Sequence, residues 1–85
     1  MKHITLTPDS PSRDILAFNV RRLRKEHGLS QTVLAARMGL DSERLLTYVE
    51  CARSGARLDT IDRLADALGV KAYELLTPPA GGAPC

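Results

Sequence analysis

The chain of 85 residues has no tryptophan, one phenylalanine and two tyrosines, so aromatic side chains cannot fill the interior of its fold. Hydrophobic residues nevertheless make up 44% of the sequence, and they must supply an aliphatic core. Leucine, alanine, valine and isoleucine suit a small helical bundle better than a sheet. The length allows one domain and excludes two.

Cysteine is almost as scarce, because only Cys51 and Cys85 occur and they lie far apart. His3 and His27 are isolated as well, so no pair of these residues has the spacing of a zinc site. We therefore expect inert thiols, no structural metal or disulfide, and no cofactor. The chain also lacks a carboxylate pair, a nucleophile with its base and a glycine-rich phosphate loop. We expect no enzymatic activity and no small-molecule ligand.

Long apolar runs are absent too, and no stretch is long enough to cross a bilayer. The opening residues MKHITLTPDS lack the apolar centre of a signal peptide. We therefore expect a cytoplasmic protein with no membrane partner.

The net charge of +2 indicates little by itself, but the charges are unevenly distributed. Residues 13–27 carry five basic and two acidic residues, and residues 51–57 carry two basic residues and no acidic one. The segments 30–50 and 58–76 are slightly acidic. Basic segments on both sides of a central one could bind a polyanion, although a solvated helix face explains the same charges.

The spacing of apolar residues predicts five helices, near Ser12–His27, Ser30–Met38, Ser42–Glu50, Leu58–Leu68 and Lys71–Leu76. Ser10 or Ser12 is expected to cap the first helix, Ser30 the second, and Asp41 or Ser42 the third. These helices form one domain over residues 12–77. An N-terminal arm over residues 1–11 precedes it, and a Pro/Gly-rich, disordered tail over residues 78–85 follows it.

The stretch GLSQTVLAARMGL, residues 28–40, joins two helical patterns through a short Gly-Leu turn. Helices joined this closely must cross steeply, as in a helix-turn-helix, which holds its second helix out toward a major groove. Ala35 lies where the helices approach most closely, and Gly39 takes the left-handed turn conformation. The apolar wedge that the two helices share consists of Leu34, Met38, Leu40 and Leu45.

Residues 14–76 resemble the phage-repressor and Cro-type helix-turn-helix family, or lambda-repressor-like domain, in NVRRLRKEHGLSQ, VLAARMGL, YVE and LDTIDRLADALGV. The resemblance implies a compact, all-α fold of five helices. It also implies a sequence-specific transcriptional regulator that binds double-stranded DNA, at a palindromic operator and as a homodimer. Gln31 matches a glutamine that touches phosphate or an outer base. Arg24 and Glu50 match an internal salt bridge between the first and third helices.

The chain departs from the family in having one more residue than usual between Gly39 and Leu58. Two registers of the third helix are therefore open. In one, Leu45 and Tyr48 are buried, and the residues that face the bases are Ser42, Glu43 and Thr47.

In the second register, Leu46 and Val49 are buried, and the residues that point outward are Glu43, Arg44 and Tyr48. We favour this register because it places Glu50 correctly for Arg24. The DNA-binding residues predicted from both registers and the flanking segments are Gln31, Thr32, Ser42, Glu43, Arg44, Thr47, Tyr48 and Arg53.

The acidic residues of the third helix have two interpretations. Asp41 and Glu43 complement the dipole of the helix, which is a capping role. Glu43 could instead accept a hydrogen bond from a cytosine, beside an Arg44 that binds a guanine. The family's phosphate-binding loop is also altered here to CARSGA, residues 51–56. Both features support an alternative function, a protein-interaction module that keeps the fold but binds DNA weakly or not at all.

The homodimer is expected because one short helix covers only a few base pairs. Tyr73, Leu75 and Leu76 are its predicted apolar contacts, with the Ile4–Thr7 arm as a second candidate. Alternatively, Tyr73 and Leu76 close the core of the monomer.

Overall fold

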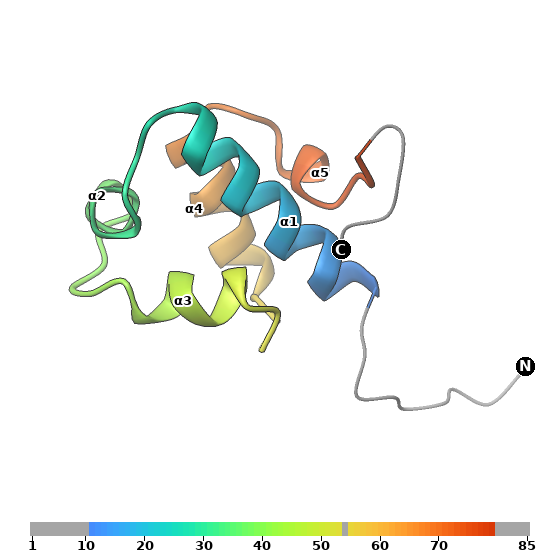
Figure 1. The fold of residues 1–85 in the computed structure, drawn as a ribbon, viewed down its shortest axis with the longest axis horizontal. Helices are drawn as coiled ribbons and strands as arrows, with labels where there is room; N and C mark the ends of the chain where they lie inside the picture. The colour runs from blue at the N-terminus through green and yellow to red at the C-terminus, as the bar shows by residue number, and fades with distance from the viewer. Residues whose placement is uncertain (1–10, 54, 80–85) are drawn as a thin grey trace, which may run out of the picture.

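The structure, a computed structural model, describes residues 11–53 and 55–79, and this part of the chain contains five α-helices and no strand (Figure 1). The helices are α1 (Pro11–Glu26), α2 (Gln31–Arg37), α3 (Arg44–Glu50), α4 (Leu58–Leu68) and α5 (Ala72–Leu75). The predicted all-α, five-helix fold is confirmed. The Ile4–Thr7 arm and the end of the predicted tail lie outside the described residues.

The bounds of α4 are the predicted ones, α1, α2 and α5 differ from their predicted bounds by one residue at each end, and α3 ends at the predicted residue, Glu50. The largest difference is at α3, which was predicted to begin at Ser42 but begins at Arg44. Ser42 accepts a hydrogen bond from the backbone N–H of Arg44 at 3.4 Å, whereas Asp41 does not cap the helix. Since α1 begins at Pro11, Ser12 lies inside that helix and is not its cap.

The turn between α2 and α3 has the predicted chemistry. The Ser30 hydroxyl accepts the backbone N–H of Val33 at 3.1 Å and caps α2. Gly39 has a φ of +78°, in the left-handed region that costs a residue with a Cβ about 1–2 kcal/mol. The N–H of Leu40 then donates to the Ala35 carbonyl at 2.9 Å and closes the turn. The predicted helix-turn-helix geometry is therefore present.

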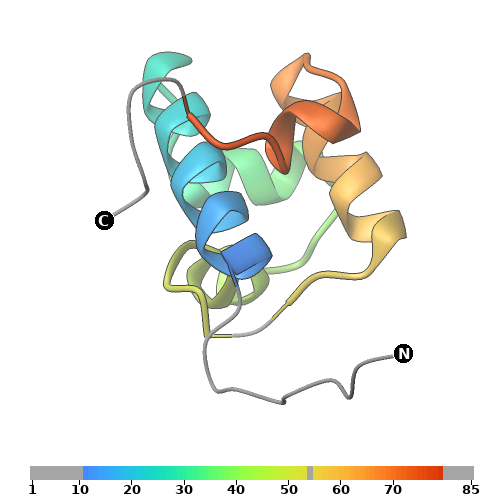
Figure 2. The same cartoon turned by 90° about the vertical axis from the view of Figure 1, so that its right-hand side faces the viewer.

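The core lies where α1 packs against α3, α4 and α5, while α2 packs against α3 and α4 against α5 (Figures 1 and 2). It is aliphatic, as the composition requires, and its largest fully buried apolar side chains are Leu34, Leu46, Leu64, Leu68, Leu75, Val20 and Val49. Leu40 and Leu45 are partly buried against this core, so they complete the predicted wedge with Leu34 and Met38. No helix in the described part is long and apolar enough to cross a membrane.

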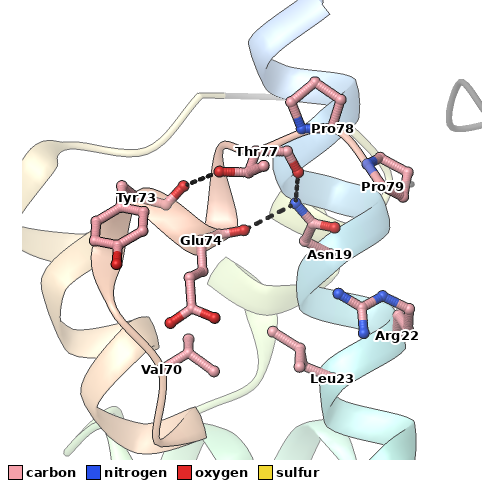
Figure 3. Close-up of a pocket in the computed structure, with 9 residues that line it drawn as sticks. All are labelled: Asn19, Arg22, Leu23, Val70, Tyr73, Glu74, Thr77, Pro78 and Pro79. Carbon is pink, nitrogen blue, oxygen red and sulfur yellow. Dashed lines mark hydrogen bonds between the residues drawn. The ribbon is translucent and has the colours of Figure 1, made fainter.

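One polar side chain lies inside the core, at a position to which the apolar pattern of α1 assigns no role. Asn19 is only 1% exposed, and its Nδ2 donates to the backbone carbonyl oxygens of Leu75 at 2.8 Å, Thr77 at 2.9 Å and Glu74 at 3.3 Å; Figure 3 draws the bonds to Thr77 and Glu74. This amide therefore donates to carbonyls that the C-terminus of α5 leaves without helical partners. Asn19 thereby fixes α5 to α1 and positions the end of the bundle.

The same packing corrects the predicted dimer contacts. Leu75 is fully buried and closes the core of the monomer, so it is unavailable to a second copy. Tyr73 and Leu76 remain 70% and 38% exposed, and the alternative that both of them close the core is wrong for Tyr73.

Candidate nucleic-acid interface

The register of α3 decides which of its side chains face outward. Leu46 and Val49 are buried at 0% and 1% exposure, whereas Tyr48 is 42% exposed. These values confirm the second predicted register and show that the first, which buries Tyr48, is wrong. α3 begins two residues later than predicted, after a bend at residues 41–43.

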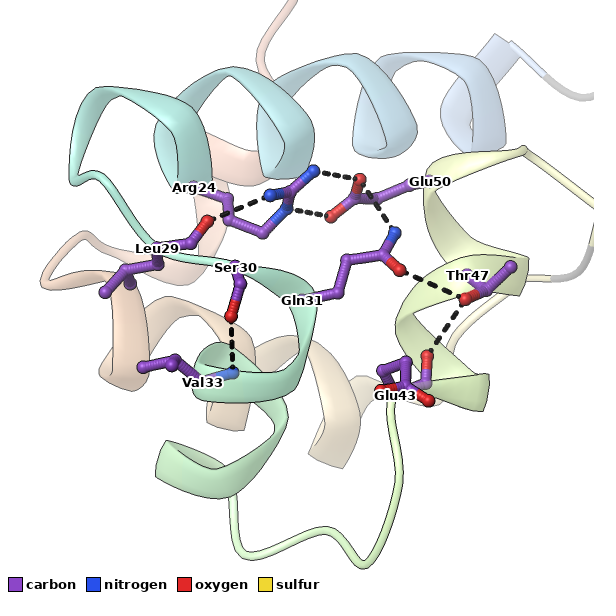
Figure 4. A network of polar contacts seen from close by, with 8 residues as sticks. All are labelled: Arg24, Leu29, Ser30, Gln31, Val33, Glu43, Thr47 and Glu50. Carbon is purple, nitrogen blue, oxygen red and sulfur yellow. Dashed lines mark hydrogen bonds and ion pairs between the residues drawn. The ribbon is translucent and has the colours of Figure 1, made fainter.

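Arg24 and Glu50 form the predicted salt bridge between α1 and the end of α3 (Figure 4). The guanidinium donates from Nε to Oε2 at 2.7 Å and from Nη2 to Oε1 at 2.9 Å, and its Nη1 donates to the Leu29 carbonyl at 2.9 Å. The side chains are only 13% and 5% exposed. The hydrogen bonds with Glu50 raise the pKa of Arg24, against the opposing effect of burial. This bidentate pair is structural, and it fixes the axis of α3 relative to α1.

Gln31 extends this pair toward the surface of α3. Its Nε2 donates to Glu50 Oε1 at 3.2 Å, and its Oε1 accepts the hydroxyl of Thr47 at the same distance (Figure 4). The Thr47 hydroxyl also lies 3.2 Å from the Glu43 carbonyl oxygen, so its single proton is shared between two acceptors. The amide of Gln31 is thus oriented by protein groups at both ends. A contact from this amide to phosphate or a base would compete with these bonds.

A second bond joins α2 to the start of α3. The Thr32 hydroxyl donates to Glu43 Oε2 at 2.8 Å, at the exposed edge of the helix-turn-helix. The Glu43 side chain makes no capping hydrogen bond to α3, so the bond to Thr32 is what positions its carboxylate. The sequence gives no local signal for these contacts, because Thr32 is 11 residues from Glu43 and Gln31 is 16 residues from Thr47.

The eight predicted DNA-binding residues thus fall into two groups. Those with polar side-chain bonds inside the protein are Gln31, Thr32, Ser42, Glu43 and Thr47. The side chains of Arg44, Tyr48 and Arg53 are exposed and have no hydrogen bond or ion pair within residues 11–53 and 55–79. Arg44 and Tyr48 are four residues apart and therefore lie on one face of α3, on which they offer a guanidinium and a phenol to a ligand.

The segment after α3 also departs from ideal geometry. Ala52 has a φ of +57°, and among the described residues it is the sole non-glycine residue with a positive φ. The N–H of Arg53 donates to the Tyr48 carbonyl at 3.0 Å, which ends α3 and starts the loop toward α4.

Two helices that cross at a tight glycine turn, with the second helix braced on one side and exposed on the other, define a helix-turn-helix domain. Residues 15–76 match the family described as the helix-turn-helix domain, which is more than half of the chain. The chain belongs to this family.

Two relatives are similar to most of this chain in sequence. A hypothetical transcription factor of Neisseria meningitidis is 41% identical over 80 residues, which are 89% of this chain and 74% of the relative. The HTH-type transcriptional regulator y4dJ of Sinorhizobium fredii is 41% identical over 78% of this chain and 84% of its own.

Two solved structures are similar to this chain in fold as well as in sequence. The crystal structure of the hypothetical transcription factor NHTF from Neisseria has a TM-score of 0.76 at 38% identity, and the match covers 91% of this chain and 90% of that one. The restriction-modification controller protein C.AhdI from Aeromonas hydrophila has a TM-score of 0.69 at 35% identity, over 74% of this chain and 94% of its own.

Proposed function

We propose that the protein is a sequence-specific DNA-binding transcriptional regulator of the phage-repressor and Cro type, which binds a palindromic operator as a homodimer. The observation that carries this proposal is the division of α3 into a braced side and an open face. Arg44 and Tyr48 are exposed together and unpaired within the described residues, while Glu50 and Thr47 fix the helix from behind. Binding of chromosomal DNA would also place the protein in the cytoplasm.

The side chains on the open face fit base recognition. A guanidinium can donate two parallel hydrogen bonds to the O6 and N7 of guanine in the major groove. The half-exposed ring of Tyr48 can pack on a thymine methyl or a sugar while its hydroxyl meets a phosphate. Arg53, beyond the end of α3, adds a charge that attracts all sequences equally.

The test is a selection of bound duplexes from a random pool, followed by titration of the selected and the random duplex at two salt concentrations. We expect the selection to converge on a palindrome with Kd at least about 1,000-fold below that of random duplex. Binding of both duplexes should weaken as salt rises. A selection that returns no common sequence would contradict the proposal.

A protein-interaction module is the second candidate, because apolar groups are exposed on the same helix-turn-helix. Val33 on α2 is 45% exposed, close in value to Tyr48 on α3. The carboxylate of Glu43 lies at this surface too, and it repels phosphate. Failure to bind any duplex, combined with the intact fold, would favour this function.

The homodimer is proposed through the exposed apolar residues of α4 and α5. Leu58 is 76% exposed, and it lies one helical turn before Ile61, which lines an apolar recess together with Leu76. Tyr73 lies in α5, one turn before Leu76, which is the C-cap residue of this helix. A second copy would bury these side chains, and each Å² of apolar surface removed from water would stabilise the dimer by about 25 cal/mol.

Sedimentation of Leu58→Glu and Tyr73→Glu tests this dimer. We expect the wild type to be dimeric and both variants to be monomeric, with weaker binding to the selected palindrome. Val33→Glu introduces the same charge at an exposed apolar residue of α2, and it should leave the dimer intact. A monomeric wild type at high concentration, with and without DNA, would refute the dimer.

A further inference from the structure

A recess of about 200 Å³ lies between the end of α2, the side of α3 that bears Leu45, and the start of α4. Its apolar floor comes from the end of α2, the turn and α3, through Met38, Leu40 and Leu45. Its polar rim comes from the start of α4, where the lining side chains are Arg57, Asp59, Thr60 and Arg63.

The rim carries more positive than negative charge. Arg57 and Arg63 are both exposed, and neither has a hydrogen bond or ion pair with another described residue. Asp59 lines the same recess, but it forms no salt bridge with either arginine in this part of the chain. Two guanidinium groups and one carboxylate leave an uncompensated positive charge that is directed at solvent.

The recess also lies beside the open face of α3. Leu45 follows Arg44 directly in the helix and lines the recess, so the recess adjoins the face that bears Arg44 and Tyr48. A helix that enters a major groove, about 12 Å wide, has a sugar-phosphate backbone along each side. The recess is therefore next to one of these two backbones when α3 is in the groove.

We propose that Arg57 and Arg63 bind a backbone phosphate of the duplex at this recess, and that they take over from the family's altered loop. This inference rests on the proposed function. Planar guanidinium groups bind phosphate oxygens through paired, charge-assisted hydrogen bonds, and the hydroxyl of Thr60 offers a further donor. Asp59 weakens the site, since its carboxylate repels the same phosphate.

Titration of random and selected duplex with Arg63→Gln and Arg57→Gln, over a series of salt concentrations, tests this assignment. We expect each variant to bind both duplexes about 3- to 10-fold more weakly and equally so, because phosphate contacts carry no base information. The slope of log K against log salt should fall by about one ion for each arginine. Asp59→Asn should change the affinity in the opposite direction, so that it binds both duplexes more tightly than the wild type.

Lys71→Gln is the matched control, because it removes one exposed positive charge beside α5, in a recess lined by α4 and α5 residues and by none from α3. Melting curves confirm that each variant is folded. If Arg63→Gln and Lys71→Gln have the same affinity and salt slope, the recess does not bind phosphate although the protein binds DNA. If the wild type binds no duplex at all, the proposed function fails and the phosphate site fails with it.

Discussion

The two flanks of α3 differ in whether their polar side chains are bonded to other groups of the protein. Toward α1 and α2, Glu50 and Thr47 are hydrogen-bonded to Arg24 and Gln31 inside the protein. Toward α4, Arg57 and Arg63 surround a recess and make no bond to any other described residue. The difference separates two tasks, because one flank fixes the helix and the other is free to bind a ligand.

This division explains why charge alone says little about the interface. Arg24 lies in the most basic segment of the sequence, yet each of its three guanidinium nitrogens donates to Glu50 or to the Leu29 carbonyl. Arg63 lies in a segment with an acidic balance, yet its guanidinium is available. The arginines available to bind DNA are those that make no hydrogen bond or ion pair with another described residue.

The largest effect is expected from Glu50→Ala, which tests the braced flank. It would leave Arg24 partly buried without its carboxylate and remove one acceptor of Gln31, at a cost of about 3 kcal/mol. In a domain of this size, thermal melting should then shift by more than about 10 °C.

Glu26→Ala is the matched control for this melting experiment. Glu26 pairs with Arg22 at 3.0 Å in α1, but their side chains are 58% and 42% exposed. An exposed pair of this kind contributes at most about 1 kcal/mol. Equal shifts for the two variants would show that the buried bridge does not brace α3.

An intermediate effect is expected from Glu43→Gln, which lies between the two flanks. The amide oxygen can still accept the hydroxyl of Thr32, so the fold should be unchanged. Loss of the carboxylate should tighten binding of random duplex about 2- to 5-fold and reduce the preference for the selected site. Asp66→Asn removes the same charge at a recess between α4 and α5, and its titration should match the wild type. If Glu43→Gln binds random duplex more tightly but keeps the same preference for the selected site, Glu43 has no role in discriminating between DNA sequences.

The smallest effect is expected from Ala52→Gly, at the end of the braced helix. Glycine removes the strain of the left-handed conformation, about 1–2 kcal/mol, but it adds entropy to the unfolded chain. The net gain in the free energy of unfolding should be about 0.5 kcal/mol in a denaturant titration. Ala56→Gly, where φ is not positive, should instead reduce stability, and a loss at both positions would show that Ala52 is not strained.

The fold could be predicted from the sequence because its signals are local. The stripe of Leu16, Val20 and Leu23, the cap at Ser30 and the turn at Gly39 each act within a few residues, and each is present in the structure. Even Arg24 and Glu50, although far apart, could be paired through the family resemblance. That pairing also selected the correct register of α3.

The internal bonds of the candidate interface could not be predicted in this way. Thr32 meets Glu43, and Gln31 meets Thr47, only because α2 and α3 cross at a particular angle. Asn19 finds its carbonyl partners more than 50 residues away at the end of α5. Such contacts depend on the packed backbone, and the residue types by themselves fit solvent-exposed positions equally well.

The claim that the open face of α3 reads bases is tested most directly by the ratio of Kd values for random and selected duplex, compared between the wild type and Arg44→Ala. Arg44 has no partner among the described residues, so its loss should leave the melting temperature unchanged. We expect the ratio to fall at least about 10-fold, which is the equivalent of one bidentate contact to a base. Binding to random duplex should weaken much less. An unchanged ratio would show that the open face of α3 does not read bases, and the protein-interaction function would then explain the exposed residues better.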